Sequence, residues 1–415
     1  MNRIVPQTYL VGGAVRDRLL GLEPREKDWV VTHSSPEEMV RQGFQPVGKD
    51  FPVFIHPQSG EEYALARTER KSGRGYQGFT FFTGTEVTLE EDLQRRDLTI
   101  NAIAQAADGA LIDPYGGRLD LERRLLRHVS PAFAEDPLRV LRVARFAAKF
   151  HHLGFHLANE TLALMRHIAL SGELQYLTPE RVWQESLKAL NTDNPQVFFV
   201  VLRQCAALVE VYPEIDALFG VPQPEIYHPE IDSGIHTLMA LEQVAKLTRD
   251  PVCRFATLVH DLGKARTLNQ YWPQHRGHEN LGVPLVEALT QRLGTARPFM
   301  RLGKLVAQWH LHSHRAMQLK PSTLLKLFDT LDVWRRPETL EDFLLCCEAD
   351  ARGRTGLESK PYPQAAYLRG AFAQVAPVNA ADFADANLSG KALGVAIAKR
   401  RLEKLGSYRS ECGHQ

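Results

Sequence analysis

Cysteine is scarce in this sequence, and its spacing disfavours the common cysteine-based sites. The chain has five cysteines, an odd number, and no two of them form a CxxC motif. A disulfide framework and a zinc knuckle both need paired cysteines at characteristic spacings. We therefore expect free thiols in a reducing, cytoplasmic compartment. The five are Cys205, Cys253, Cys346, Cys347 and Cys412.

Long apolar runs and a strong net charge are also absent. No segment approaches the roughly 18 apolar residues of a membrane-spanning helix, so we expect no membrane partner. The first residues lack the apolar stretch and the cleavage pattern of a signal peptide. The net charge of +1 disfavours a strongly basic nucleic-acid coat, although a local basic groove is compatible with it.

The sequence changes character near residue 131. A chain of 415 residues is too long for one ordinary core. Up to residue 130, short apolar runs alternate with glycine turns, as in "TYLVGGAVRDRLLG", "KDWVVT" and "EEYALART", which predicts an α+β head. Helical periodicity dominates afterwards. We predict a head at 1–130, a helical neck and body at 131–222, an all-α domain at 223–358 and a helical tail at 359–415, with the proline-rich stretch 220–230 as the clearest boundary in the second half.

Two carboxylates stand at the start of a predicted strand in "PREKDWVV", residues 24–31. Alternate residues of a strand share a face, so Glu26 and Asp28 are expected to project together, with Lys27 on the opposite face. Like charges at that range repel unless a cation lies between them, and Mg²⁺ takes one or two carboxylates plus substrate phosphates. Glu62, on another predicted strand, offers a third carboxylate. A solvated charged turn is the alternative interpretation.

A glycine turn and several basic segments accompany these acids. Gly12 and Gly13 in "LVGGAVRD" lie between a strand and a helix, where backbone N–H groups approach an anion, and Arg16 is one turn further along. The segment "RKSGRGYQGFTF" at 70–81 is typical of a mobile loop near a phosphate or a base. "LQRRDLTINAIA" adds Arg95, Arg96, Asp97 and Asn101.

The segment "EDPLRVLRVARF" places four charged residues at i+3 spacings, which predicts one slanted ridge on a helix. Apolar residues surround the ridge, so we expect it to face a cleft, although a solvated face is the alternative. The four residues are Asp136, Arg139, Arg142 and Arg145.

Together, the motifs GGAVRD, ExDW, RRDxTxNA, DPxGG and EDPLRxxRxxRF resemble those of the class II tRNA nucleotidyltransferases, over about residues 1–215. These are the CCA-adding enzymes and the bacterial poly(A) polymerases. The resemblance implies a polymerase β-type head, a small mixed sheet with helices. It also implies Mg²⁺ held by Glu26 and Asp28, with Glu62 as a further ligand, and a triphosphate held by Gly13, Arg16 and Arg96. The family usually has Asp-x-Asp, whereas this chain has Glu at position 26.

By the same resemblance, the arginines of the ridge line the nucleotide pocket, and Asp136 with Arg139 reads the base edges of CTP and ATP. The chemistry agrees, because Arg offers a donor fork and Asp accepts from an exocyclic amine. Cytosine and adenine both carry such an amine beside a ring acceptor, whereas uracil and guanine carry a carbonyl oxygen there. A wrong base would leave buried polar groups unpaired.

A second constellation is built from histidines. His260-Asp261 ends an apolar helix in "FATLVHDLGKA", while His236 and Asp350 stand on earlier and later predicted helices. One histidine on an apolar helix is usually a core residue, but the spaced set H…HD…D favours a divalent transition ion. This set resembles the HD phosphohydrolase superfamily over about 230–350. Further candidate histidines are His278, His310 and His312.

A nucleotidyltransferase head followed by an HD domain resembles the long, gamma-proteobacterial branch of the CCA-adding family. That resemblance implies tRNA, CTP and ATP as partners. It also implies phosphatase, 2′-nucleotidase and 2′,3′-cyclic phosphodiesterase activities at the HD site with Ni²⁺ or another divalent transition metal, in a monomer with a possible homodimer. The alternatives are a poly(A) polymerase, a non-catalytic RNA-binding relative and a pure HD phosphohydrolase.

Overall fold

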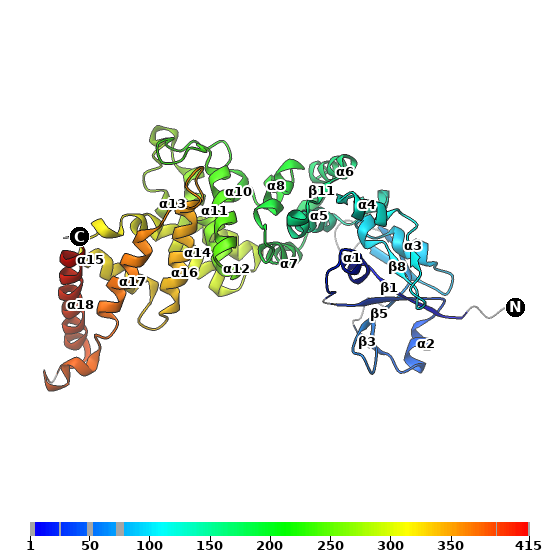
Figure 1. Ribbon diagram of the computed structural model, residues 1–415, viewed down its shortest axis with the longest axis horizontal. Helices are drawn as coiled ribbons and strands as arrows, with labels where there is room; N and C mark the ends of the chain where they lie inside the picture. Colours follow the sequence, from blue (N-terminus) through cyan, green and yellow to red (C-terminus); the bar gives the residue numbers. More distant parts are fainter. Residues whose placement is uncertain (1–4, 25, 48–52, 72–78, 387, 414–415) are drawn as a thin grey trace. The chain divides into compact units, whose positions relative to one another are not determined.

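The computed structural model describes residues 5–24, 26–47, 53–71, 79–386 and 388–413. The chain divides into two compact units, which Figure 1 shows as ribbons. The first unit contains residues 1–189 and 197–211, and the second contains 190–196 and 212–415. Most of the loop predicted near 70–80 falls in 72–78, outside the described residues.

A mixed sheet forms the head of the first unit, as predicted (Figure 1). Among the described residues its strand order is β3-β4-β5-β2-β1-β8-β9, in which β2 and β5 run parallel and the other neighbours antiparallel. Its strands are β1 (Gln7–Val11), β2 (Asp28–Thr32), β3 (Gln45–Val47), β4 (Val53–Ile55), β5 (Glu62–Leu65), β8 (Ala104–Gln105) and β9 (Leu111–Ile112). Two further pairs are β6 (Arg67–Lys71) with β7 (Phe79–Thr83), and β10 (Leu125–Leu126) with β11 (His156–Leu157).

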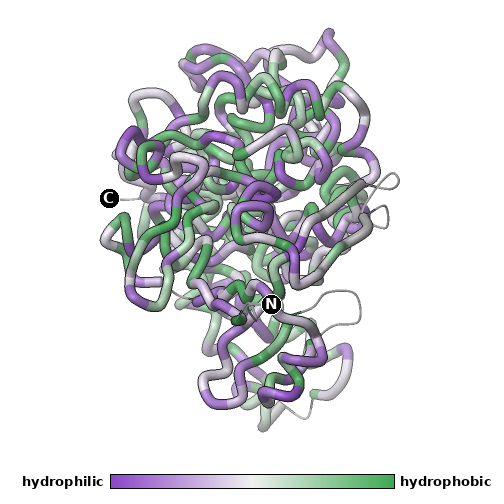
Figure 2. The backbone as a smooth tube through the Cα atoms, turned by 90° about the vertical axis from the view of Figure 1, so that its right-hand side faces the viewer, coloured by the Kyte–Doolittle hydropathy of each residue, from purple (hydrophilic) through white to green (hydrophobic). Residues whose placement is uncertain are grey.

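The sheet has a separate apolar cluster on each face, because successive side chains of a strand point to opposite sides. Val30 and Ala66 pack with Leu93 in one cluster, whereas Val31 packs with Met39 in the other. The tube of Figure 2 accordingly changes often between hydrophobic and hydrophilic colouring. The head helices are α1 (Gly13–Leu19), α2 (Pro36–Arg41), α3 (Leu89–Gln94) and α4 (Gly117–Glu122).

The helical part of the first unit follows a short 3₁₀ turn, Pro131–Glu135. The helix predicted from the first residues of "EDPLRVLRVARF" begins only at Leu138, since Pro137 is its N-cap and Asp136 is extended. The predicted four-residue ridge is therefore wrong in one member: Asp136 precedes the helix that carries the three arginines. The helices here are α5 (Leu138–Phe150), α6 (Asn159–Leu170), α7 (Pro179–Leu190), α8 (Gln196–Gln204) and α9 (Leu208–Val211).

The regular elements of the second unit, among its described residues, are helices joined by loops. Its core is made by α11, α12, α13, α14 and α16, which pack on one another. Arg254 is fully buried, and its guanidinium donates to the carbonyls of Leu190, Thr192, Ala245 and Thr248. The helices are α10 (Pro213–Asp216), α11 (Ser233–Leu247), α12 (Pro251–Val259), α13 (His278–Leu293), α14 (Arg297–His314), α15 (Pro321–Leu331), α16 (Glu338–Arg352), α17 (Pro363–Val375) and α18 (Gly390–Cys412).

The predicted domain boundaries stay predictions, and the structure adds one finding about them. The proline-rich stretch 220–230 lies inside the second compact unit, whereas the two units separate between residues 189 and 212. All five cysteines are free thiols, as predicted. In the described part of the chain, no helix combines the length and the apolar character needed to cross a membrane.

Candidate active sites

Two of the three head carboxylates lie side by side in the sheet. Asp28 opens β2 and is the direct partner of Glu62, which opens the parallel strand β5. Both residues share the face of Val30 and Ala66. Glu26 precedes β2, so strand alternation does not place it beside Asp28, although its charge acts on the Asp28 carboxyl. The pairing with Glu62 depends on strand order, which no local pattern contains.

The carboxylates are accessible and do not form a closed cluster. Glu26, Asp28 and Glu62 are exposed, and in the described residues they are not among the groups whose ligand atoms all lie within 4.8 Å. Partial burial of its carboxyl raises the pKa of Asp28; Arg96 opposes the rise and the charge of Glu26 adds to it. A bound cation would relieve this cost of ionisation.

The opposite face carries a separate set of contacts. Lys27 donates to Glu61 at 3.0 Å, and the indole of Trp29 donates to the other oxygen of Glu61 at 2.8 Å. Trp29 also stacks on Tyr63 with ring centroids 5.6 Å apart. Lys27 is thus engaged away from Asp28 and Glu62, which agrees with the predicted alternation.

The glycine turn brings Arg96 against the first helix. Gly12 has a φ of 67°, and a Cβ on it would lie 2.9 Å from Nη1 of Arg96. The positive φ favours glycine, whereas the contact is with the end of a flexible side chain. Arg96 is anchored on Asp92 at 3.1 Å. Arg16 is only 4% exposed, with its guanidinium 2.7 Å from Asp17 and 2.5 Å from the side-chain oxygen of Asn101.

A buried aspartate links this turn to the helical neck. Asp97 accepts from the side chain of Asn101 at 2.8 Å and pairs with Arg142 of α5 at 2.7 Å. Burial opposes its ionisation, but Arg142 and the hydrogen bond from Asn101 hold the pKa of Asp97 well below its usual range. Arg16, Asn101, Asp97 and Arg142 therefore form one continuous polar network.

The other ridge residues have partners as well, and two of these partners were not foreseen. Arg139 donates to the carbonyls of Ala132 and Arg95, both at 2.6 Å, which fixes the plane of its guanidinium. Arg181 holds Asp136 at 2.9 Å, and Glu185 holds Arg145 at 2.5 Å. Both partners lie on α7, in "TPERVWQES", where their i+4 spacing was the only available signal.

The predicted HD residues come together in the second unit. His236 lies on α11, His260 caps α12 and is followed by Asp261, and Asp350 lies on α16. Nε2 of His236 is 3.0 Å from Asp350, and Nε2 of His260 is 3.1 Å from Asp261. Three of the four, His236, His260 and Asp261, form a buried group with ligand atoms within 4.8 Å of one another. The structure brings the four residues together, and their role as metal ligands stays a prediction.

A second buried group shares Asp261. Its Oδ1 is 3.2 Å from His278 and 3.6 Å from His310, and these two Nε2 atoms are 3.4 Å apart. His278 reaches this place because Gly263 has no side chain: a Cβ there would lie 1.9 Å from the carbonyl oxygen of His278. Lys264 is also close, 2.6 Å from Oδ2 of Asp261.

Two histidines near the end of α14, His312 and His314, have different surroundings. His312 packs on Trp309 with ring centroids 4.5 Å apart and is in none of the buried ligand groups of the described residues. His314, which the sequence reading overlooked, contacts Asp350 at 2.6 Å. His310 and His314 stand one helical turn apart on α14, so i+4 spacing was the available signal.

The HD centre fits a divalent transition ion. Nε2 of His260 and both carboxylate oxygens of Asp261 are buried and lack a hydrogen-bond partner within the described structure. Such atoms are costly unless something binds them. Imidazole nitrogen and carboxylate oxygen are suitable ligands for such an ion. Burial lowers the pKa of His260, but Asp261 and Asp350 outweigh it and raise that pKa to about 10.

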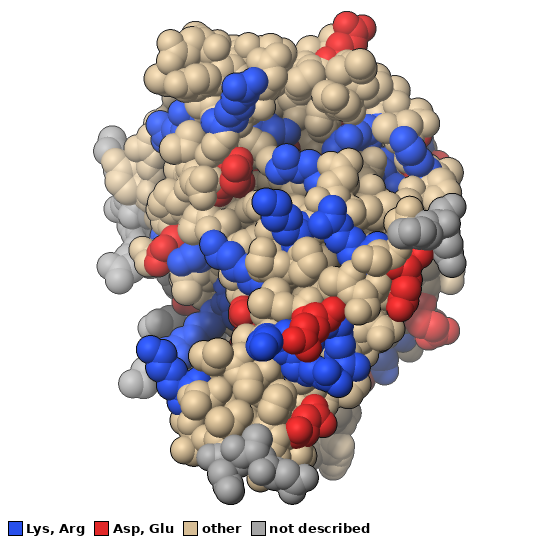
Figure 3. All heavy atoms as spheres, turned by 90° about the vertical axis from the view of Figure 1, so that its left-hand side faces the viewer, with Lys and Arg blue, Asp and Glu red and all other residues tan. Residues whose placement is uncertain are grey.

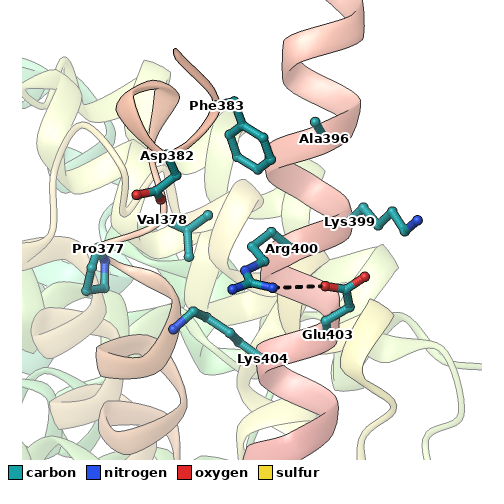
Figure 4. A pocket seen from close by; sticks show the side chains of 9 residues that line it. All are labelled: Pro377, Val378, Asp382, Phe383, Ala396, Lys399, Arg400, Glu403 and Lys404. Carbon is teal, nitrogen blue, oxygen red and sulfur yellow. Dashed lines mark ion pairs between the residues drawn. The ribbon is translucent and has the colours of Figure 1, made fainter. Parts of the chain in front are cut away.

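A basic cavity of about 590 Å³ lies between α18 and the 3₁₀ segment Ala380–Ala386. Figure 4 shows Arg400 and Lys404 extending from α18 toward Pro377 and Val378, whereas Lys399 points away from them. Arg400 is paired to Glu403 at 3.7 Å, and Asp382 also lines the cavity. On the side of the molecule drawn in Figure 3, Lys and Arg side chains are more widespread than Asp and Glu. This surface suits contact with phosphate groups.

The polar network predicts that Asp97→Asn destabilises the protein. The change leaves Arg142 without its counter-ion, which costs about 1–3 kcal/mol. The lower end is expected, because 36% of the Arg142 side chain is exposed. Since the pKa of Asp97 is depressed in the folded state, the loss is complete at pH 7 and shrinks only below about pH 4. Urea unfolding measures it, with exposed Glu122→Gln as the control; equal stability of the two variants would contradict the network's role.

The raised pKa of His260 predicts proton release on metal binding. At pH 7.5 the imidazole is protonated in the metal-free centre and must lose that proton to coordinate, so about one proton leaves per Ni²⁺. Apparent Ni²⁺ affinity should therefore rise with pH. Calorimetry in buffers of different ionisation enthalpy counts the protons, and His312→Ala, outside the centre, serves as the control. A binding enthalpy that is independent of the buffer would refute this.

Comparisons with known proteins agree with both centres. Three family descriptions match successive segments: "Poly A polymerase head domain" at 8–127, "Probable RNA and SrmB- binding site of polymerase A" at 154–219 and "HD domain" at 234–334. The Thermotoga maritima CCA-adding enzyme complexed with tRNA-CCA shares the fold, with a TM-score of 0.61 at 19% identity over 98% of this chain and 90% of that one.

Two further relatives complete the comparison. The Bacillus stearothermophilus CCA-adding enzyme in complex with CTP has a TM-score of 0.55 at 25% identity, covering 97% of this chain and 89% of that one. The Multifunctional CCA protein of Alkalilimnicola ehrlichii is 59% identical over 405 residues, 98% of each chain. At that identity and coverage, the chain belongs to the multifunctional CCA protein family.

Proposed function

We propose that this protein adds CCA to the 3′ end of tRNA from CTP and ATP without a nucleic-acid template, and that its HD domain hydrolyses phosphate esters in support of tRNA maturation and repair. The observation that carries the proposal is the presence of both centres in one chain of this family: carboxylates paired across β2 and β5, and a buried HD cluster.

In the head, Glu26 and Asp28 hold Mg²⁺ and Glu62 is the further ligand. When bound, this ion would lower the pKa of the attacking 3′-hydroxyl and balance the negative charge that develops at the α-phosphate. The accessibility of these carboxylates suits a site in which substrate phosphates complete the coordination. The adjacent Trp29–Tyr63 stack packs the opposite face of these strands.

Gly13, Arg16 and Arg96 hold the triphosphate. Arg96 is supported for this role by its anchor on Asp92 and its contact with the Gly12 turn. Arg16 is buried, so its charge acts on the turn from within the polar network. The orientation of the phosphates therefore depends on side chains from α3 and α5 as well as on the glycines.

Asp136 and Arg139 select the base, with Arg142 and Arg145 supporting the pocket. Arg181 holds Asp136 and two main-chain carbonyls hold Arg139, so both side chains are preorganised. An exocyclic amine of C or A donates to the Asp136 carboxylate, whereas a carbonyl at that position would face it without a hydrogen.

In the HD domain, His236, His260, Asp261 and Asp350 hold Ni²⁺ or another divalent transition ion, which supplies an activated water and polarises the phosphate ester. Asp261 presents its second oxygen to His278 and His310, so the same centre offers ligands for a second ion. Its substrates are phosphomonoesters, 2′-nucleotides and 2′,3′-cyclic phosphates at RNA ends.

The helical body and the basic surface of α18 hold tRNA by shape and phosphates, because A-form grooves hide the base edges. The cytoplasmic location and the monomer, with a possible homodimer, stay predictions. The matched polymerase A descriptions keep poly(A) synthesis as the second candidate. Incubation of tRNA lacking CCA with CTP alone decides: CCA addition requires incorporation of two C residues, and none would reject it.

The two centres should fail separately when each is altered. Asp28→Ala is expected to reduce CCA addition at least about 1,000-fold by removing a metal ligand, with hydrolysis of a 2′,3′-cyclic nucleotide unchanged. His260→Ala should do the reverse. Lys27→Ala is the matched control for the first variant and His312→Ala for the second. Equal CCA addition by wild type and Asp28→Ala would favour a non-catalytic RNA-binding protein, and loss of both activities in His260→Ala would favour a pure HD phosphohydrolase.

Position 26 tests the longer carboxylate arm. Glu26→Asp keeps the charge and restores the Asp-x-Asp spacing, so CCA addition should stay within about tenfold of wild type, whereas Glu26→Gln should lose about 100-fold. The measurement is single-turnover CTP incorporation across Mg²⁺ concentrations. A Glu26→Gln variant with the wild-type Mg²⁺ dependence would remove Glu26 from the ligand set.

A further inference from the structure

The proline-rich segment Gly220–Asp232 is a closed loop of the second unit. Its two ends are joined, because Pro222 and Asp232 form an antiparallel bridge and the N–H of Gln223 donates to the carbonyl of Ile231 at 2.6 Å. Nδ1 of His236, in the helix that follows, lies 3.1 Å from Glu230 of this loop. The sequence suggested a boundary here, but the loop packs on the HD centre.

Glu230 is the buried acid of this loop. Its side chain is 2% exposed, and Oε1 lies 3.1 Å from Nδ1 of His236 and 3.0 Å from Nδ1 of His228. Its other oxygen accepts from the N–H of Thr355 at 3.4 Å, just after the helix that carries Asp350. Glu230 thus contacts the predicted ligand His236 and the segment that follows the helix of the predicted ligand Asp350.

The other histidines of the centre show what is distinctive about His236. Nδ1 of His260 faces the carbonyl of Thr257 at 2.7 Å, Nδ1 of His278 faces that of His275 at 2.8 Å, and Nδ1 of His310 faces that of Val306 at 3.0 Å. Each of these rings can donate from Nδ1 to a carbonyl, which directs Nε2 toward the centre. His236 also has a carbonyl, that of Gly353 at 2.9 Å.

Within the described structure, His236 differs from these three by having a carboxylate at hydrogen-bond distance of Nδ1, since Glu230 lies at 3.1 Å, whereas Glu279 lies 3.8 Å from Nδ1 of His278. A carboxylate at this position fixes the tautomer and the ring orientation, and its charge makes Nε2 a stronger donor to a metal. His228 holds the same carboxylate from the other side, with its ring 4.6 Å from that of His236. A neutral carbonyl provides the orientation but not the charge.

We propose that Glu230 is a positioning residue of the HD centre: through Nδ1 of His236 it strengthens binding of a divalent transition ion at Nε2, and so makes the loop 220–232 part of the metal site. The inference rests on the proposed metal dependence of the HD domain. It adds a second layer that lies outside the matched HD segment, 234–334.

The test measures Ni²⁺ binding to full-length, chelator-stripped protein by calorimetry. Glu230→Gln keeps the size and an acceptor oxygen but removes the charge, and we expect affinity to fall about 10- to 100-fold. Glu230→Asp keeps the charge and should recover part of the loss. Glu225→Gln is the matched control, because it removes an exposed carboxylate from the same loop.

Further readouts separate positioning from general damage. Hydrolysis of a 2′,3′-cyclic nucleotide by Glu230→Gln should recover at raised Ni²⁺ with an unchanged KM, while CCA addition and thermal unfolding of the metal-free protein stay as in wild type. If Glu230→Gln unfolds at a lower temperature than wild type, Ni²⁺ affinity is compared between Glu230→Asp and wild type, below the unfolding temperatures of both. Glu230→Asp should then bind Ni²⁺ more weakly than wild type. Wild-type affinity in both variants, or an equal loss in Glu225→Gln, overturns the inference. Wild-type protein that binds no Ni²⁺ overturns the proposed HD function itself.

Discussion

A carboxylate removed from water must be compensated by nearby donors or cations, and this constraint organises both units. In the first unit Asp97 is almost buried and is surrounded by Asn101 and Arg142. In the second, Asp261 is fully buried between histidines and Lys264. Each aspartate fixes the positions of residues that lie far apart in the sequence.

The two aspartates differ in whether protein groups hydrogen-bond to their carboxylate oxygens. The charge of Asp97 is balanced by protein groups alone, so the network from Arg16 to Arg142 is a structural frame for the glycine turn at Gly12 and Gly13. The oxygens of Asp261 lack hydrogen-bond partners in the described structure, although four histidines and a lysine surround them. One arrangement is complete and stabilises the fold, whereas the other is suited to a cation.

The candidate catalytic centres also differ in how far they are preformed. Glu26, Asp28 and Glu62 are exposed and form no closed cluster of ligand atoms, as suits a site that a triphosphate and its metal complete together. The HD ligands are buried, and the rings of His236, His260, His278 and His310 are held through Nδ1 by carbonyls of their own surroundings. A preformed site of this kind selects its ion by ligand type and geometry.

Local patterns in the sequence were enough to predict the fold class and to group the candidate residues. Strand alternation and glycine turns located β1, β2, β5 and α1, and the set H…HD…D located the HD cluster, because these signals are local or recur in fixed order. Only the tertiary structure decided which residues meet. Asp28 lies beside Glu62, Arg181 contacts Asp136, and Glu185 contacts Arg145. His314 contacts Asp350, and Glu230 lies against His236. Most of those contacts depend on strand order and helix packing, which bring together residues up to 45 positions apart and leave no periodic trace in the chain.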